Sequence, residues 1–152
     1  MATSEVRGVA RRTCSVCGRI HYVDPKVAVG VAVFRDDALL LVRRTMEPAR
    51  GLWALPGGFL DAGEHPTAAA ARETLEESGV TVTVGAVLDV FVNPPEEGGV
   101  VFLLYAADWL AGEPTPGDDT DAAGFFRRTE LPPLAFASTA AAVARWPAST
   151  QG

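Results

Sequence analysis

The 152-residue chain is long enough for one compact domain and short for two, and 48% of its residues are hydrophobic, as in ordinary globular proteins. Its formal net charge of -6 disfavours a nucleic-acid partner, which normally needs a basic face, but allows a small anionic substrate held through a metal ion. No apolar run resembles a signal peptide or reaches the length of a membrane span, so we expect a cytoplasmic protein with no membrane partner.

The first 25 residues are predicted to lie outside the main domain. Residues 1–13 look like a flexible arm, and a short knuckle around Cys14-x-x-Cys17 follows them. This spacing suits metal binding or redox chemistry better than a secreted disulfide framework. A structural zinc ion needs four protein ligands, and His21 offers a third but no fourth is evident. Two copies of the cysteine pair could instead meet across a homodimer and complete a zinc site.

Residues 26–148 are predicted to form one domain, followed by a short tail at 149–152. Strands that lie before, between and after two helices indicate an α/β fold of the α+β type, a mixed β-sheet sandwiched between helices. Apolar runs, turn residues and helix-stop signals give the element bounds. The predicted elements are strands at 27–34 and 38–42 joined as a hairpin, a loop at 45–63, a helix at 66–78 stopped by Gly79, strands at 86–92 and 100–107, an acidic loop at 114–121, and a helix at 138–146 with Ser138 as N-cap and Pro147 after it.

Three glutamates share one face of the helix predicted at 66–78. At about 100° per residue, Glu76 and Glu77 lie within roughly 60° of Glu73 around the helix axis. Like charges at these spacings destabilise a helix, and Arg72 can offset only part of the repulsion. Bound divalent cations would remove the rest, because Mg²⁺ prefers carboxylate oxygens and shares them with phosphates. The opposite face is apolar and is expected to dock on the sheet; it comprises Ala68, Ala71 and Leu75.

Glutamate-rich helix faces are usually only solvated, but here the complete spacing is informative. The segment from Gly58 to Val80 resembles the Nudix box, G-x5-E-x7-R-E-U-x-E-E-x-G-U, in which U is a bulky apolar residue. Only Thr74 departs from this pattern, at an apolar position where its methyl group can still pack. The matching residues are Gly58, Glu64, Arg72, Glu73, Glu76, Glu77, Gly79 and Val80.

Segments outside the box resemble the Nudix branch that contains ADP-ribose and FAD pyrophosphatases, which often carries a small zinc ribbon before the Nudix domain. A Trp- and Pro-containing run that marks NADH pyrophosphatases is absent from 81–105. The resemblance therefore implies an ADP-ribose-type pyrophosphatase that acts on a small nucleotide substrate. The resembling segments are CSVCG at 14–18, HY at 21–22, DPKV at 24–27, EP at 47–48, GLWALPGG at 51–58, PG at 116–117 and LAFAS at 134–138.

The same resemblance implies a Mg²⁺- or Mn²⁺-dependent reaction. The metal ions would neutralise phosphate charge, orient the diphosphate and activate a water molecule, and the products would be two phosphomonoesters. Arg72 would orient the glutamates through ionic hydrogen bonds. The implied metal ligands are Glu73, Glu76 and Glu77, with Glu64 as a supporting residue or further ligand and a backbone carbonyl near Gly57 or Gly58.

Residues outside the box are candidates for substrate binding. Arg43 and Arg44 end a predicted strand, and one of them is expected to reach the diphosphate, because neighbouring strand residues face opposite sides. Trp53 leads the aromatic candidates for stacking on adenine, although strand aromatics usually pack in the core. Asp119 or Asp121 could help to bind metal or water, or their loop could be merely solvated. The other aromatic candidates are Phe34, Phe91 and Tyr105.

Three alternative functions share some of these features. A sanitising nucleoside triphosphate pyrophosphatase would have the same box, but Glu96 and Glu97 in the loop at 93–99 would repel a triphosphate tail. A non-catalytic metabolite sensor would not need the intact set of interacting charges. A zinc-ribbon nucleic-acid module is disfavoured by the acidic balance and by the incomplete set of zinc ligands.

Overall fold

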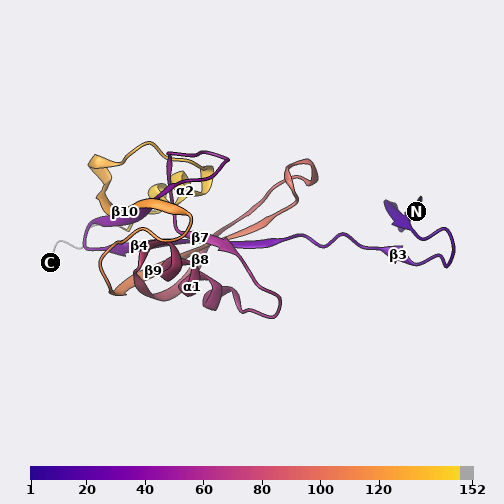
Figure 1. The fold of residues 1–152 in the computed structure, drawn as a ribbon, viewed down its shortest axis with the longest axis horizontal. Helices are drawn as coiled ribbons and strands as arrows, with labels where there is room; N and C mark the ends of the chain where they lie inside the picture. The colour runs from indigo at the N-terminus through magenta and orange to yellow at the C-terminus, as the bar shows by residue number, and fades with distance from the viewer. Residues whose placement is uncertain (148–152) are drawn as a thin grey trace.

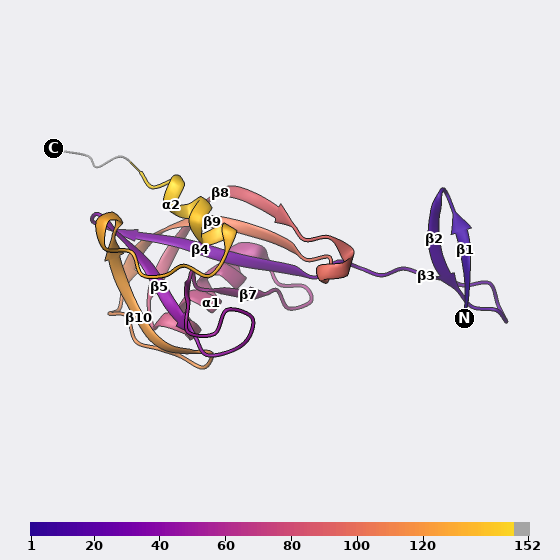
Figure 2. The same cartoon turned by 90° about the horizontal axis from the view of Figure 1, so that it is seen from above.

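The computed structural model describes residues 1–147, so the tail predicted at 149–152 lies outside the described residues. The N-terminal segment forms a small antiparallel sheet of β1 (Ala2–Val6), β2 (Val9–Thr13) and β3 (Ile20–His21). Figures 1 and 2 show this sheet standing apart from the rest of the chain at the end of an extended segment.

The prediction of a flexible arm at 1–13 was wrong, because these residues form the β1–β2 hairpin. Its two-residue turn is Arg7–Gly8, and both residues have positive φ, 52° and 78°. Two positive φ angles match the twist of the flanking strands. The turn escaped prediction because arginine rarely adopts this backbone conformation.

The second sheet has seven strands and carries the rest of the fold. Its main path runs β10-β5-β4-β9-β8, with β4 and β9 parallel and the other neighbours antiparallel. The short strands β6 and β7 pair with β5 and β4 off this path. The strands are β4 (Val27–Arg35), β5 (Ala38–Arg44), β6 (Trp53–Ala54), β7 (Gly57–Phe59), β8 (Thr81–Val92), β9 (Val101–Ala111) and β10 (Thr120–Arg127).

The four predicted strands are all present in this sheet, and the structure adds three more strands to it. Strands β6 and β7 lie within the loop predicted at 45–63, and β10 follows the acidic loop. The centre of strand β10, Ala122-Ala123-Gly124, consists of residues that are depleted in strands, so its pairing with β5 supplies the structure. Strand β8 begins at Thr81 rather than at residue 86, and bulges interrupt its pairing with β9.

Two helices cover opposite faces of the sheet, α1 (Pro66–Ser78) and α2 (Ala137–Ala144) (Figure 1). Alternate residues of β4 point to each side: Val31 belongs to the core under α1, and Ala32 to the core under α2. The predicted mixed sheet sandwiched between helices is therefore confirmed. Within residues 1–147, no helix is both long and apolar enough to cross a membrane. Residues 1–147 also contain two short 3-10 helices, η1 (Pro95–Glu97) and η2 (Arg128–Glu130).

The last helix differs from its prediction at both ends. Phe136, not Ser138, is the N-cap, and no side chain caps the helix there. The helix ends before Arg145, and Trp146 leaves it to pack edge-on against Phe34 at 5.4 Å between ring centroids. The helix therefore ends before Pro147, because Trp146 leaves it to bury its indole ring.

The loop between β9 and β10 seals the C-terminal end of α1. Thr115 N–H donates to Ser78 O at 2.8 Å, and the Thr120 hydroxyl donates to Glu77 O at 2.9 Å. These bonds satisfy carbonyls that have no partner within the helix. Gly117 passes so close to the helix that an added Cβ would overlap the Glu76 carbonyl oxygen. A glycine is therefore required at this position.

Replacement of Gly117 tests this packing. Gly117→Ala forces the loop away from α1, and overpacking of this kind costs roughly 1–3 kcal/mol. We expect the melting temperature to fall by several degrees in thermal unfolding followed by circular dichroism. Gly85→Ala is the matched control, because a Cβ there meets its nearest atom at an ordinary 3.4 Å. Equal melting temperatures for the two variants would contradict the close approach.

Candidate active site

Helix α1 has the predicted bounds, and local signals at both ends explain them. His65 precedes the helix in an extended conformation, and its Nδ1 accepts a hydrogen bond from Thr67 N at 3.2 Å. Pro66 occupies the first turn, where its missing N–H is harmless. Gly79 ends the helix at φ 69°, in the left-handed conformation that glycine adopts without strain.

The buried face of α1 is not the face predicted from apolar residues. Leu75 is 51% exposed, whereas Thr74 and Ser78 are completely buried beside alanines. Both hydroxyls donate to carbonyls one turn earlier, at 2.7 Å to Ala70 and 2.6 Å to Thr74, so their burial leaves no donor unpaired. Of the predicted docking residues, Ala68 and Leu75 are exposed and that part of the prediction was wrong, whereas Ala71 is partly buried against the core. The buried residues of the helix are Ala69, Ala70, Thr74 and Ser78.

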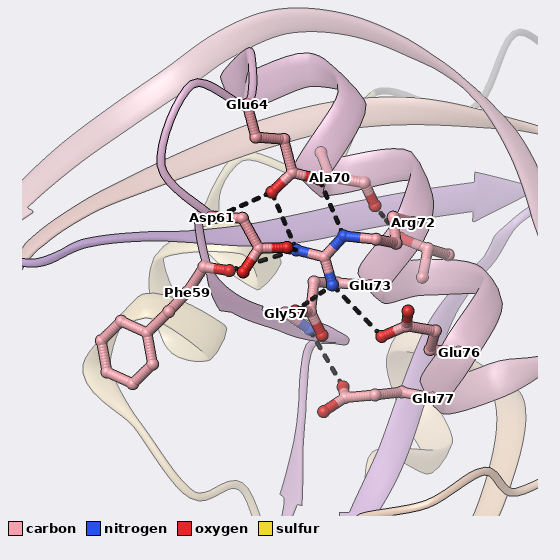
Figure 3. A network of polar contacts seen from close by, with 10 residues as sticks. Gly57, Phe59, Asp61, Glu64, Ala70, Arg72, Glu73, Glu76 and Glu77 are labelled. Atoms are coloured by element: carbon pink, nitrogen blue, oxygen red, sulfur yellow. Dashed lines mark hydrogen bonds and ion pairs between the residues drawn. The ribbon is translucent and has the colours of Figure 1, made fainter.

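Because α1 is rotated about its axis relative to the prediction, Glu73 and Glu77 point toward strand β7 instead of toward solvent. Gly57 N–H donates to Glu77 Oε2 at 3.0 Å. A Cβ added to Gly58 would lie 2.5 Å from the carboxylate of Glu73, so a larger residue there would displace that carboxylate. Backbone of β7 and carboxylates of α1 therefore form one surface, as Figure 3 shows.

Arg72 lies at the centre of the acidic cluster (Figure 3). Its Nε and Nη2 donate to the two oxygens of Glu64 at 2.7 and 2.9 Å, a bidentate pair. Its Nη1 donates to Glu73 at 2.8 Å and to Glu76 at 3.2 Å. Its Nη2 also donates to the carbonyl of Phe59 at 3.2 Å. One guanidinium thus ties three side chains of the box to the strand β7 backbone.

The glutamates of the cluster differ in their electrostatic environment. The hydrogen bonds from Arg72 lower the pKa of Glu64 to about 2. Burial raises the pKa of Glu73, although Arg72 opposes the shift. Burial also raises the pKa of Glu77 to about 7, because only the Gly57 N–H and the more distant Arg44 favour its ionised form. Glu77 is therefore the carboxylate with the least local compensation.

A cavity of about 390 Å³ opens beside Glu73 and Glu77. Arg44 lines it from β5, and Asp119 lines it from the loop before β10. The Arg44 side chain is held by a bond to the Pro48 carbonyl at 2.9 Å. Cationic and anionic groups thus line one space of the size that small ligands occupy.

Arg43 lies outside this cavity, as the alternation of strand residues requires. It pairs with Asp121 at 2.7 Å, and its guanidinium lies 5.9 Å from the ring centroid of Trp53. Trp53 packs edge-on against Phe126 at 4.8 Å. The sequence offered Arg43 or Arg44, and Asp119 or Asp121, as site residues. Arg44 and Asp119 line the cavity, whereas Arg43 and Asp121 pair with each other outside it.

Phe136 was not among the predicted site residues. Arg44 lies over its ring, with 4.9 Å between the guanidinium carbon and the ring centroid. No local pattern links these two residues, since the contact forms only when the segment before α2 lies alongside β6. The contact between Arg44 and Phe136 was therefore not predictable from the positions of aromatic residues in the sequence.

The donor chemistry of this surface fits a hard divalent cation. It presents carboxylate oxygens from α1 next to glycine backbone that a ligand can approach closely. Within residues 1–147, no three acidic, histidine or cysteine groups converge as a ready-made cage. That arrangement suits Mg²⁺, which keeps several waters and completes its shell with substrate phosphates.

The cysteine knuckle lies in the separate N-terminal sheet. Gly18 N–H donates to the Cys14 carbonyl at 2.9 Å, and both cysteines are free thiols. His21 lines the same hollow as Cys14 and Cys17. Within the described residues, however, the three side chains do not converge as a metal site, so zinc at Cys14 and Cys17 is disfavoured, as the incomplete set of ligands led us to expect.

Comparison with known proteins identifies the family. Residues 24–147 match the model of the NUDIX domain. The chain is 38% identical over 117 residues to an ADP-ribose pyrophosphatase of Methanocaldococcus jannaschii, covering 76% of this chain and 69% of that protein. It is 34% identical over 122 residues to a putative ADP-ribose pyrophosphatase of Bacillus subtilis, covering 77% of this chain but 57% of that protein.

A solved structure supports the same assignment. The crystal structure of a NUDIX hydrolase from Nitrosomonas europaea superposes with a TM-score of 0.86 at 32% identity, covering 95% of this chain and 84% of that one. The chain belongs to the Nudix hydrolase family. Nudix hydrolases generally use divalent metal ions, which agrees with the oxygen-rich surface described above.

The raised pKa of Glu77 predicts a pH-dependent penalty in metal-free protein. A carboxyl whose pKa rises on folding supports the folded state below its ordinary value of 4.5 and loses that support as pH passes about 7. The full shift corresponds to on the order of 3 kcal/mol. We therefore expect Glu77→Gln to raise the melting temperature in EDTA by several degrees at pH 8, and by much less near pH 5.

Glu76→Gln is the matched control for this measurement, because the Glu76 side chain is 51% exposed. It should change the melting temperature little at either pH. A Glu77→Gln variant that is no more stable than wild type at pH 8 would refute the account of a poorly compensated buried carboxylate.

Proposed function

We propose that this protein hydrolyses the diphosphate of ADP-ribose to AMP and ribose 5-phosphate. The single observation that carries the proposal is the Arg72-centred carboxylate cluster opening on a cavity that Arg44 lines. The relatives from Methanocaldococcus jannaschii and Bacillus subtilis, which bear ADP-ribose pyrophosphatase in their names, support this choice of substrate.

Glu73, Glu76 and Glu77 are the proposed ligands for Mg²⁺ or Mn²⁺, with the Gly58 backbone beside them and Glu64 in support. When bound, such ions would neutralise phosphate charge and increase the acidity of a water molecule. Because Arg72 engages both oxygens of Glu64, we assign Glu64 mainly to positioning Arg72. The Gly57 N–H holds Glu77 with one oxygen fixed.

Arg44 is the proposed diphosphate-binding residue. Its guanidinium faces the cavity and is steadied by Pro48 and Phe136, so little side-chain entropy is lost on binding. A guanidinium can contact two phosphate oxygens at once. Arg43 and Trp53, also predicted as substrate-binding residues, support the neighbouring wall in this proposal, because they pack with Asp121 and Phe126.

Asp119 is the proposed partner of the attacking water. It lines the cavity on the same side as Arg44, where the Thr45 hydroxyl donates to its carbonyl, and its negative charge contributes to the raised pKa of Glu77. In the reaction, the water oxygen forms a bond to one phosphorus as the bond from that phosphorus to the bridging oxygen breaks. The departing phosphate keeps the bridging oxygen and the electron pair, and the water's proton leaves through the Asp119 side of the cavity.

Other predictions complete the proposal. We propose residues 26–148 as the catalytic domain and 1–25 as an accessory segment through which a homodimer could form. A nucleic-acid partner is disfavoured by the net charge of -6, and a cytoplasmic location fits a nucleotide substrate. The sensor alternative is disfavoured because a non-catalytic protein would not need to keep the four interacting charges of Arg72, Glu73, Glu76 and Glu77.

Removal of one proposed metal ligand tests the mechanism. We expect Glu77→Gln to fold normally and to lose at least about 100-fold in kcat with ADP-ribose and Mg²⁺, because a metal ligand acts on the transition state. Glu130→Gln removes an exposed carboxylate from η2 and should keep wild-type turnover. Turnover of wild-type protein that persists in excess EDTA, or full activity of Glu77→Gln, would refute the metal-dependent mechanism.

A comparison of kcat/KM between classes of nucleotide tests the proposed substrate. We expect kcat/KM for ADP-ribose to exceed that for every nucleoside triphosphate by at least about tenfold, since the acidic residues of η1 disfavour a triphosphate tail. FAD and NADH belong in the same panel. A clear preference for a triphosphate would assign the protein to nucleotide-pool sanitation and leave the proposed catalytic residues unchanged.

A further inference from the structure

Two cysteines lie together in the N-terminal sheet, which the proposed hydrolysis does not use. The turn between β2 and β3 carries both: Cys14 N–H donates to the Arg19 carbonyl, and Gly18 N–H donates to the Cys14 carbonyl, each at 2.9 Å. Cys14 and Cys17 line one hollow of about 390 Å³, which we call the thiol hollow. Cys17 is exposed and Cys14 is half-buried, so a small solute can reach the pair, far from helix α1 (Figures 1 and 2).

The thiol hollow does not fit the zinc ion that a zinc ribbon holds. A structural zinc ion takes four protein ligands. Within the part of the chain that the structure describes, no third histidine, cysteine or carboxylate converges on the two thiols. The local charge also opposes a cation, because residues 1–23 carry four arginines and one glutamate, a net charge of +3 in a chain whose total is -6. The two thiols therefore lack both the partners and the charge that would hold a zinc ion.

The same environment favours a reactive thiolate. The pKa of Cys14 is lowered by hydrogen bonding from the backbone N–H groups of Cys17 and Val16, and further by the thiol of Cys17. Neighbouring guanidinium groups also favour the negatively charged form of a thiol. Cys14 is thus the nucleophile of the pair, and Cys17 stands three residues further along the same turn, next to the sulfur that Cys14 would present after reaction.

The charge around the thiol hollow also bears on which molecules reach it. Arg19 lines the hollow together with both cysteines. Arg11 lies at the rim, 4.9 Å from the ring centroid of Tyr22, which lines the hollow too. A small molecule that carries carboxylates is attracted to this surface, and one that carries ammonium groups is repelled. The attraction weakens as salt is added, because exposed charges are screened.

We propose that Cys14 and Cys17 form a thiol–disulfide exchange site for small acidic disulfides. The Cys14 thiolate forms a bond to one sulfur of the incoming disulfide, whose S–S bond breaks; the departing sulfur keeps the electron pair and takes a proton. Cys17 then loses its proton to solvent, attacks the Cys14 sulfur and releases the second thiol. Two protein thiols are thereby oxidised by two electrons to one disulfide, and the incoming disulfide is reduced to two thiols. This site is independent of the proposed hydrolysis.

Mass spectrometry of the full chain after incubation with oxidised glutathione tests the exchange. We expect wild-type protein to lose two hydrogens and to give a peptide map with a Cys14–Cys17 disulfide. Cys17→Ser should stop at a mixed disulfide of Cys14 with one glutathione, and Cys14→Ser should react at least about tenfold more slowly. Two thiols that stay free, or a stoichiometric zinc ion that protects them in the isolated protein, would overturn the site.

The charge preference has its own test. Arg19→Gln should slow the reaction with oxidised glutathione about twofold or more and change the reaction with neutral hydroxyethyl disulfide little. Arg127→Gln is the matched control, because Arg127 is an exposed arginine of β10 in the other sheet. Wild-type rates that are equal for acidic, neutral and cationic disulfides, or that do not fall with salt for the acidic one, would overturn the preference for acidic disulfides.

Discussion

One guanidinium faces more negative charge than it can neutralise. Arg72 hydrogen-bonds to Glu64, Glu73 and Glu76, and Glu77 lies one helical turn further on with only a backbone N–H as its hydrogen-bond donor. The bidentate bonds to Glu64 take much of the positive charge, as the lowered pKa of that carboxyl shows. The pKa of Glu77 rises because burial of its charge is poorly compensated. A divalent cation would supply that compensation, which makes the cluster a proposed metal site rather than a set of surface ion pairs.

The fold serves this arrangement through small residues rather than large ones. Thr74 and Ser78 let α1 lie close to the sheet, because each buried hydroxyl bonds to a carbonyl of its own helix. Gly58 lets β7 approach the glutamates, and Gly117 lets the loop after β9 seal the end of the helix. Larger side chains at these positions would separate the backbone of β7 from the carboxylates of α1. Packing of the fold and chemistry of the site therefore depend on the same close contacts.

Local signals made helix α1 and the placement of its glutamates predictable. His65–Pro66 and Gly79 mark the ends of α1, and the spacing of the box places the carboxylates on one face. The buried face was not predictable from hydrophobicity, because Thr74 and Ser78 are classed as polar while Leu75 is apolar but exposed. The contact between Arg44 and Phe136 was likewise hidden, since it depends on tertiary folding. Strand alternation correctly implied that only one of Arg43 and Arg44 faces the site, but only the structure shows which one.

The central claim is that the cluster around Arg72 binds a divalent cation. The most direct measurement is a titration of metal-free protein with Mn²⁺ followed by electron paramagnetic resonance, comparing wild type with Glu73→Gln. Free Mn²⁺ gives a sharp spectrum that broadens on binding, so bound and free ions are counted separately. The account predicts saturable binding to the wild-type protein and a large loss of affinity in Glu73→Gln. Equal binding by both proteins, or no binding by wild type even with AMP present, would contradict it.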